Sequence, residues 1–403
     1  MPLPADALNG LKVLELGQLI AGPFAGKTLA DFGADVIKIE PVEGGDPLRQ
    51  WRLLRGGTSV WWEVQSRNKR SVALDLKTTA GQAAVRALAL QADVLVENFK
   101  PGTLEAWGLG WDALHALNPR LVMLRISGFG QTGPDAQKPG FGVLGEAMGG
   151  LRHLTAEPGR VPVRVGLSIG DTLAALHGVI GVLLALRHRE VNGGLGQMVD
   201  VALYESVFNV TESLLPEYDA FGTVRGPGGS ALPGIAPSNA YPCEGGAYVL
   251  VGGNGDSIFR RLMQAIGRDD LGADAGLASN AGRVGRVAEI DAAIAAWTSQ
   301  RPIEDVLTTL EAARVPAGRI YTVADIATDP QYLARDMLLQ TADADGRPLK
   351  VPGIVPKLSA TPGRLQYPAP RLGEHNAQVL GRSSQPGWPL RHATALAAND
   401  DSA

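Results

Sequence analysis

Short apolar runs alternate with helical patterns along the first half of the chain. Residues 11–16 and 34–40 are apolar runs, and residues 21–32 between them carry the apolar spacing of a helix. So short a crossover that contains a helix is typical of two parallel strands in one sheet. Further strands are predicted at 71–76, 93–97 and 121–127, and a further helix at 79–91. The chain up to about residue 200 therefore predicts a doubly wound α/β sheet.

A loop of glycines and small residues at 166–170 leads into the most apolar helical pattern of the chain. The apolar run at 179–186 indicates a buried helix and is too short to span a bilayer. Asp171 lies where the loop becomes the helix, and a carboxylate there is stabilised by free N–H groups and the helix dipole. Two interpretations stay open: a helix N-cap, or a carboxylate nucleophile in a glycine-lined cleft.

The composition changes near residue 223, which predicts a second, smaller domain. Residues 226–237 are rich in glycine and proline, which marks a domain boundary or a mobile segment. A strand at 248–251 then runs into the glycine loop 252–255. That loop is either an ordinary turn or a flap and backbone N–H cradle over an acyl group. The later predictions are helices at 256–266, 286–298 and 302–313, a helix at 322–336 interrupted near Pro330, an extended segment at 349–356 and a loosely ordered tail after Gly381.

Composition and charge narrow the function classes. Hydrophobic residues make up 45% of the 403 residues and charged residues 19%, which suits a globular protein with a sizeable core. The formal net charge of −4 gives no broad attraction to nucleic acid. Cys243 is the only cysteine, so a disulfide framework and a cysteine-based metal site are excluded, and the histidines lack metal-ligand spacing. No signal-peptide pattern opens the chain, so we expect a cytoplasmic protein that does not bind membranes.

The loops after the predicted strands lack the common nucleotide fingerprints. Doubly wound folds bind their ligands at these loops. No Gly-x-Gly-x-x-Gly pattern follows the first strand, and the chain contains no Walker-type phosphate loop. The sequence therefore contains neither of the motifs that usually indicate NAD or ATP as a ligand.

Five segments of the chain, in order, resemble the class III CoA-transferases, also called the CaiB/BaiF family, which includes formyl-CoA transferase. The segments are residues 21–41, 67–77, 97–102, 127–134 and 166–178. The resemblance extends from about residue 10 to about residue 375. The nearest likeness is to members that move CoA between dicarboxylates, with succinyl-CoA as donor. The resemblance therefore implies transfer of CoA from an acyl-CoA to a carboxylic acid.

The resemblance also implies a fold. Members of the family have a large Rossmann-like CoA-binding domain built from both chain ends and a smaller α+β domain. Carried over to this chain, residues 1–222 form the first part of the large domain, residues 223–330 the small domain, and residues 331–403 return to the large domain. Two protomers are expected to form a homodimer of interlocked rings.

The same resemblance implies the site. The catalytic aspartate maps onto Asp171, and the substrate side of the site onto Gln18, Ile20 and Phe141. The CoA contacts map onto Leu74, Lys77, Asn98 and Phe99. The mobile glycine loop maps onto Gly252, Gly253, Asn254 and Gly255. Taken from the residues alone, Lys77 is more often a solvated surface charge, and Asn98-Phe99 is more often a turn with a core aromatic. No metal or permanently bound cofactor is expected, since CoA and acyl-CoA are substrates.

The chain departs from formyl-CoA transferase at the cations that meet CoA. Pro41 and Ala106 stand where that enzyme has arginines. Other cations must then meet the CoA phosphates, and the candidates are Arg49, Lys69, Arg70 and Lys100. For a clamp on the distal carboxylate of the acceptor, the candidates are Arg49, Arg67 and Arg164.

Two further departures bear on specificity. Ile20 replaces an active-site glutamine, although Gln18 lies two residues earlier, which argues against formyl or oxalyl groups. Phe141 stands where the related acyl-CoA racemases carry a catalytic histidine. Because phenylalanine cannot transfer a proton, a transferase is favoured over a racemase. An acyl-CoA racemase or epimerase and a non-catalytic CoA-binding protein remain the alternatives.

Overall fold

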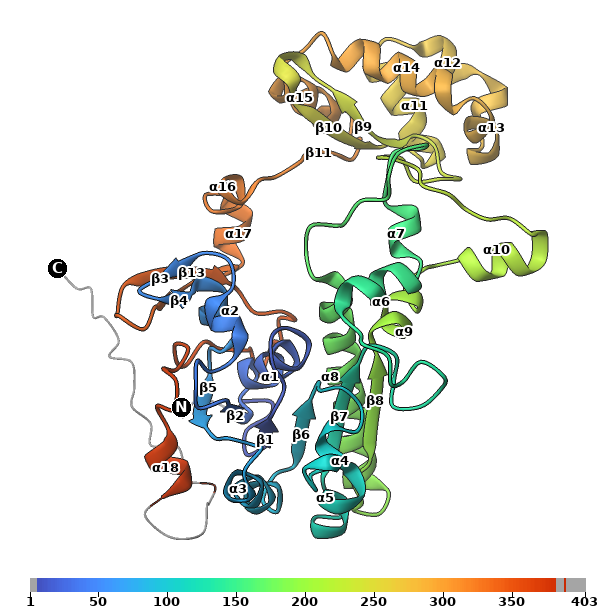
Figure 1. The fold of residues 1–403 in the computed structure, drawn as a ribbon. Helices are drawn as coiled ribbons and strands as arrows, with labels where there is room; N and C mark the ends of the chain where they lie inside the picture. The colour runs from blue at the N-terminus through green and yellow to red at the C-terminus, as the bar shows by residue number, and fades with distance from the viewer. Residues whose placement is uncertain (1–5, 382–387, 389–403) are drawn as a thin grey trace, which may run out of the picture. The chain divides into compact units, whose positions relative to one another are not determined.

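The computed structural model describes residues 6–381 and residue 388 (Figure 1). The chain forms two compact units. The large unit consists of residues 1–151, 165–221 and 331–403, and the small unit of residues 152–164 and 222–330. The predicted tail after Gly381 lies, apart from Trp388, outside the described residues.

A six-stranded parallel sheet forms the centre of the large unit. Its strands are β1 (Lys12–Glu15), β2 (Asp35–Glu40), β5 (Lys69–Ala73), β6 (Val94–Glu97), β7 (Val122–Ser127) and β8 (Met198–Ala202). The order across the sheet is β5-β2-β1-β6-β7-β8, and every neighbouring pair is parallel. This confirms the predicted doubly wound α/β fold and places the reversal of strand order between β1 and β6. The prediction missed the edge strand β8, because the exposed Asp200 interrupts its apolar pattern.

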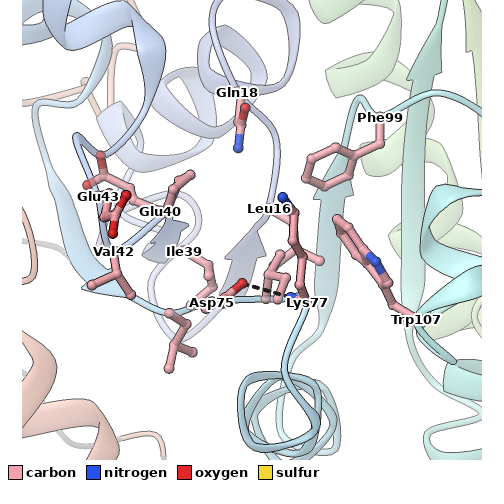
Figure 2. A pocket seen from close by; sticks show the side chains of 13 residues that line it. Leu16, Gln18, Ile39, Glu40, Val42, Glu43, Asp75, Lys77, Phe99 and Trp107 are labelled. Carbon is pink, nitrogen blue, oxygen red and sulfur yellow. Dashed lines mark hydrogen bonds between the residues drawn. The ribbon is translucent and has the colours of Figure 1, made fainter.

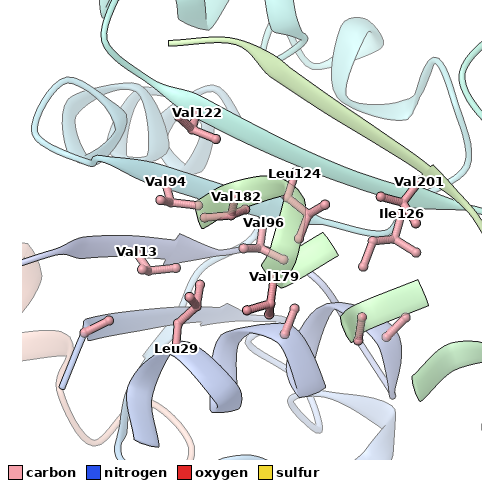
Figure 3. Packing of buried hydrophobic residues seen from close by; sticks show 14 of the residues in the cluster. Val13, Leu29, Val94, Val96, Val122, Leu124, Ile126, Val179, Val182 and Val201 are labelled. Atoms are coloured by element: carbon pink, nitrogen blue, oxygen red, sulfur yellow. The ribbon is translucent and has the colours of Figure 1, made fainter. Parts of the chain in front are cut away.

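Helices cover both faces of this sheet. On one face, α1 (Ala21–Asp31) and α8 (Ile169–Val191) pack on alternate strand residues such as Val13 and Val96, as Figure 3 shows. On the other face, α3 (Thr79–Ala89), α5 (Trp111–Leu117) and α18 (Asn376–Leu380) complete a second core. Since successive side chains of a strand point to opposite faces, a sheet covered on both sides needs continuous apolar runs. These are the runs that the sequence analysis identified as strands.

Helix α8 begins earlier and is longer than its apolar run suggested. It has 23 residues, and by length and composition alone it is long and apolar enough to cross a membrane. A core helix of a globular protein has the same properties, and one face of α8 packs on the sheet through Ala174, Gly178 and Val182. A Cβ at Gly178 would lie 2.8 Å from a methyl carbon of Leu124, so glycine allows this close approach.

The small unit contains an antiparallel sheet with helices packed on it. The strands β9 (Ser238–Pro242), β10 (Tyr248–Gly252) and β11 (Ala317–Arg319) are ordered β11-β10-β9. Three helices, α11 (Asp256–Ala265), α14 (Val287–Thr298) and α15 (Ile303–Ala312), supply apolar residues to its core. The unit therefore has a core of its own, apart from the two cores of the large unit.

The helix predicted at 322–336 differs in the structure in one respect. In place of one interrupted helix, α16 (Val323–Ile326) and α17 (Pro330–Ala334) are separate, and α17 begins at the proline, where a missing N–H costs nothing. The hairpin β12 (Leu338–Ala342) and β13 (Pro348–Pro352) follows.

The other elements are η1 (Pro47–Gln50), β3 (Leu54–Arg55), β4 (Thr58–Ser59), α2 (Val60–Gln65), α4 (Thr103–Ala106), α6 (Gly142–Met148), α7 (Leu151–Leu154), α9 (Leu203–Phe208), α10 (Leu214–Phe221), η2 (Glu244–Gly246), α12 (Asp269–Ala273), η3 (Ala275–Leu277) and α13 (Asn280–Gly285).

Candidate functional site

A cavity of about 690 Å³ opens at the carboxyl ends of β1, β2, β5 and β6 (Figure 2). It therefore lies beside the reversal of strand order, which is where doubly wound sheets bind ligands. The lining residues are Leu16, Gln18, Ile39, Glu40, Pro41, Val42, Glu43, Leu74, Asp75, Leu76, Lys77, Phe99 and Trp107. Among them are four of the residues predicted for the site: Gln18, Leu74, Lys77 and Phe99.

Two aromatic rings form one wall of this cavity. Phe99 and Trp107 meet edge to face with ring centroids 5.5 Å apart, and Figure 2 shows both on the side opposite Val42 and Glu43. Such a pair offers an apolar aromatic wall to a ligand. The sequence analysis did not single out Trp107, because an aromatic residue just after a short helix is more often part of a core.

Asn98 lies behind the cavity and holds the loop after β1. Its side chain accepts a hydrogen bond from the Gln18 N–H (2.7 Å) and donates one to the Gln18 carbonyl (2.9 Å). Gly17 and Gly22 leave room for it, since a Cβ at Gly17 would lie 3.0 Å from the Asn98 Oδ1. Asn98 thus shapes the loop that carries Gln18 and does not itself line the cavity. Ile20, the other residue predicted beside Gln18, is buried at the start of α1.

The charges around the cavity correct the predicted phosphate cations. Arg49, Lys69 and Arg70 are each more than nine-tenths buried. Arg49 Nε lies 2.8 Å from Glu40 Oε2, Lys69 Nζ 2.7 Å from Glu15 Oε2, and Arg70 Nη2 2.5 Å from Asp35 Oδ2. Because a buried cation needs an anionic partner, these three are engaged inside the fold and do not face a ligand. Lys77, the one cation among the described residues that line the cavity, and the exposed Lys100 remain.

The predicted carboxylate clamps need a similar correction. Arg67 is buried, and its guanidinium binds both carboxylate oxygens of Asp31, at 2.9 and 2.7 Å. Arg49 forms the same bidentate pair with the two carboxylate oxygens of Glu40. Burial opposes ionisation of Glu40, but the hydrogen bonds and charge of Arg49 outweigh burial and lower the pKa of that carboxyl. Of the three candidates, only Arg164 is exposed.

Asp171 lies in the first turn of α8, beside Gly142 of α6. The N-cap of the helix is Ser168, so Asp171 is the third helical residue and the N-cap interpretation is wrong. Its half-buried carboxylate packs against Gly142, the first residue of α6. A Cβ at Gly142 would overlap Oδ2 and lie 2.9 Å from Cγ. Phe141, the N-cap residue of α6, is 65% exposed directly before this contact.

The glycine loop of the small unit is anchored at three backbone positions. The Gly252 N–H donates to Pro316 and the Gly253 N–H to Pro237, both at 2.9 Å. The Asn254 carbonyl accepts from the wholly buried Arg283, at 2.7 Å. The loop thus has a defined shape in this structure, and its role as a flap stays a prediction.

Comparisons with known proteins agree with this fold. Residues 8–376 match the model of CoA-transferase family III. The chain is 48% identical to succinyl-CoA–D-citramalate CoA-transferase of Chloroflexus aurantiacus over 94% of each protein. It is 37% identical to succinate–glutarate CoA-transferase of Agrobacterium fabrum, over 94% of this chain and 96% of that one.

Solved structures point the same way. A CaiB/BaiF family protein from Brucella suis superposes with a TM-score of 0.82 at 36% identity, over 94% of this chain and 99% of that one. Rv3272 from Mycobacterium tuberculosis superposes with a TM-score of 0.81 at 28% identity, over 93% and 99%. The fold, the family match and these relatives together confirm the resemblance found in the sequence: the chain belongs to CoA-transferase family III.

Proposed function

We propose that this enzyme moves CoA from succinyl-CoA to a dicarboxylate, with Asp171 as the nucleophile. The observation that carries the proposal is the Asp171 carboxylate, held against Gly142 in the first turn of α8. The positive end of the helix favours its ionised form, which is the nucleophilic one. The substrates are proposed from the activities of the relatives, which include succinyl-CoA-dependent enzymes at 48% and 41% identity.

The first half of the reaction transfers CoA to the enzyme. An Asp171 oxygen attacks the thioester carbonyl carbon of succinyl-CoA. The carbon–sulfur bond breaks, and the products are an aspartyl–succinyl anhydride and the CoA thiolate. The thiolate then attacks the Asp171 carbonyl carbon and releases succinate, which leaves an aspartyl-CoA thioester.

The second half repeats these steps with the acceptor. A carboxylate oxygen of the acceptor attacks the aspartyl thioester and expels the CoA thiolate, which forms a second anhydride. The thiolate attacks the acceptor side of this anhydride, so the new acyl-CoA leaves and Asp171 is restored. No net electron or proton transfer occurs, so the reaction requires no redox partner.

We assign the cavity to CoA. Phe99 and Trp107 offer an aromatic wall for the adenine ring, and Lys77 a charge for a phosphate. The glycine loop 252–255 is assigned to cover the reacting carbonyl, since water would hydrolyse the anhydride. We propose that the enzyme is cytoplasmic.

We assign the exposed apolar face of α8 to a second copy of the chain. Leu176, Ile180 and Leu184 recur every four residues on this helix and are 41%, 55% and 66% exposed. Such a stripe on a 23-residue helix is costly to leave in water. Ile180→Asp is therefore expected to lower the mass measured by light scattering to that of one chain, and an unchanged dimer would contradict this assignment.

Mass spectrometry of acyl-CoA exchange tests the function. Wild-type protein is mixed with succinyl-CoA and a panel of mono- and dicarboxylic acids, and new acyl-CoA masses identify the acceptor. Asp171→Ala is expected to abolish exchange while the protein stays folded. Asp269→Ala, which removes an exposed carboxylate from the first turn of α12, serves as the matched control and should keep full activity.

The outcome separates transfer from isomerisation. Asp171→Glu should also lose exchange, because one more methylene moves the nucleophile by about an ångström. Exchange retained by Asp171→Ala would refute the nucleophile. Deuterium incorporated at the α-carbon without any new acyl-CoA would favour a racemase instead.

A further inference from the structure

Four charged side chains are buried together beneath the loop that follows β1. They are Glu15, Lys38, Asp46 and Lys69, here named the buried ion cluster, and all four side chains are 0% exposed. Lys38 Nζ lies 3.0 Å from Glu15 Oε1 and 2.8 Å from Asp46 Oδ2. Lys69 Nζ lies 2.7 Å from Glu15 Oε2. Gly26 of α1 leaves room for the Glu15 carboxylate, which a Cβ there would overlap.

Stability alone is a weak reason to keep such a cluster. Each buried ion loses its hydration, and apolar residues of the same volume are often equally or more stabilising. Burial opposes the charged form of Lys38, but Asp46, Glu15 and Glu40 outweigh it and raise the pKa of the amine. Lys38 therefore remains charged. The remaining hydrogen bonds of the cluster show which part of the backbone it holds in place.

Those remaining bonds end on the loop between β1 and α1 and on the first turn of α1. Lys38 Nζ donates to the Gly17 carbonyl at 2.7 Å, and Lys69 Nζ donates to the Pro23 carbonyl at 2.8 Å. The Asp46 carboxylate accepts from the Leu19 N–H at 3.0 Å. Asn98 pairs with both backbone groups of Gln18 from the opposite side. The loop is therefore held on either side of Gln18.

The backbone of this loop is strained at Leu19, which has a φ of 63°. The left-handed region costs a residue with a side chain roughly 1–2 kcal/mol, and such strain gathers at ligand sites. The result is that the Gln18 side chain points into the cavity (Figure 2). Within the described part of the chain, its amide has no hydrogen-bond partner and is available to a ligand.

We infer that the buried ion cluster is a positioning device for Gln18, with Lys38 and Asp46 as positioning residues and Gln18 as a residue that binds the acyl-CoA. This inference rests on the proposed function, because it takes the cavity to be the acyl-CoA site. The cluster acts through the backbone of residues 17–19 and does not touch the ligand. A Gln18 amide held in place in advance loses little conformational freedom when it binds.

A double-mutant cycle separates positioning from mere support of the fold. Gln18→Ala is expected to raise the KM for succinyl-CoA about tenfold, which is the loss of one well-placed hydrogen bond. Asp46→Asn keeps the shape of the side chain, removes its charge and is expected to raise the KM by a similar factor. If the cluster acts through Gln18, then Gln18→Ala should raise the KM less than threefold in the Asp46→Asn background.

The matched control is Asp112→Asn, which changes an exposed carboxylate in the first turn of α5, outside both the cavity and the cluster. The tenfold effect of Gln18→Ala should persist in that background. Equal effects of Gln18→Ala in the wild-type and Asp46→Asn backgrounds would overturn the inference. Wild-type protein that transfers no CoA would instead refute the proposed function.

A second variant keeps the test decisive if Asp46→Asn does not fold. Leu19→Gly leaves the cluster intact and releases the strained backbone, so it should also raise the KM for succinyl-CoA. In that background, Gln18→Ala should raise the KM little further. Amide hydrogen exchange of residues 17–20 should quicken in Leu19→Gly, with β1 and β2 unchanged. If the amide hydrogen exchange of residues 17–20 and the KM of Leu19→Gly both stay at wild-type values, the loop needs no positioning.

Discussion

Replacing Gly142 by alanine tests the placement of the nucleophile most directly. The new Cβ would overlap Asp171 Oδ2 and lie 2.9 Å from Cγ. Non-bonded heavy atoms essentially never lie closer than 3.0 Å to a Cβ, so the overlap with Oδ2 requires that oxygen to move by roughly 1 Å. A misplacement of about 1 Å at a reacting group costs on the order of a hundredfold in rate. We therefore expect kcat to fall between ten- and a hundredfold.

The assay is the initial rate of acyl-CoA exchange from succinyl-CoA, with a CoA titration beside it. Since Gly142 does not line the CoA cavity, the Kd for CoA should stay within threefold of wild type. Gly285→Ala is the matched control, because it adds the same methyl to a helical glycine whose Cβ would meet no atom within 4 Å. A folded Gly142→Ala protein with a kcat within twofold of wild type would refute the role of this contact, and with it the geometry assigned to Asp171.

Three further predictions concern binding and stability. Trp107→Ala should weaken CoA binding about tenfold in a calorimetric titration by removing half of the aromatic wall, whereas Trp111→Ala, which alters a ring stacked on His115, should not. Burial, with the nearby charge of Asp343, raises the pKa of Glu63 to about 7 from an ordinary 4.5. The folded state then holds its proton where the unfolded chain has lost it, so stability falls as pH rises from 4.5 to 7, by roughly 1–2 kcal/mol. Glu63→Gln should remove that fall in denaturant titrations at pH 5 and pH 7.5, and an equal fall in both proteins would count against it. Arg283→Met should destabilise the small unit by about 3–5 kcal/mol, because Asp256 and the carbonyls of Ala236, Leu277 and Asn254 lose their buried donor; a melting temperature unchanged from wild type would contradict this.

The sequence by itself determined the large-unit sheet and the family. Apolar runs of five to seven residues between helical patterns are typical of strands covered on both faces, and five of the six strands are found there. The ordered motifs identified CoA-transferase family III, which the family model then matched over residues 8–376. These features are local along the chain, so they can be read without knowing which segments meet.

Only the tertiary structure decided which charges are available to a ligand. Lys69 and Arg70 look solvent-exposed in the sequence, but β5 lies beside β2 with Val36 opposite Lys69, which brings Arg70 to Asp35. Lys69 meets Glu15 from β1, more than fifty residues earlier in the chain. Pairing between distant residues leaves no periodic trace, and a buried cation is recognised only when its partner is seen. The close contact between Gly142 and the Asp171 carboxylate could not be predicted for the same reason. The space that a glycine leaves open is defined by another helix.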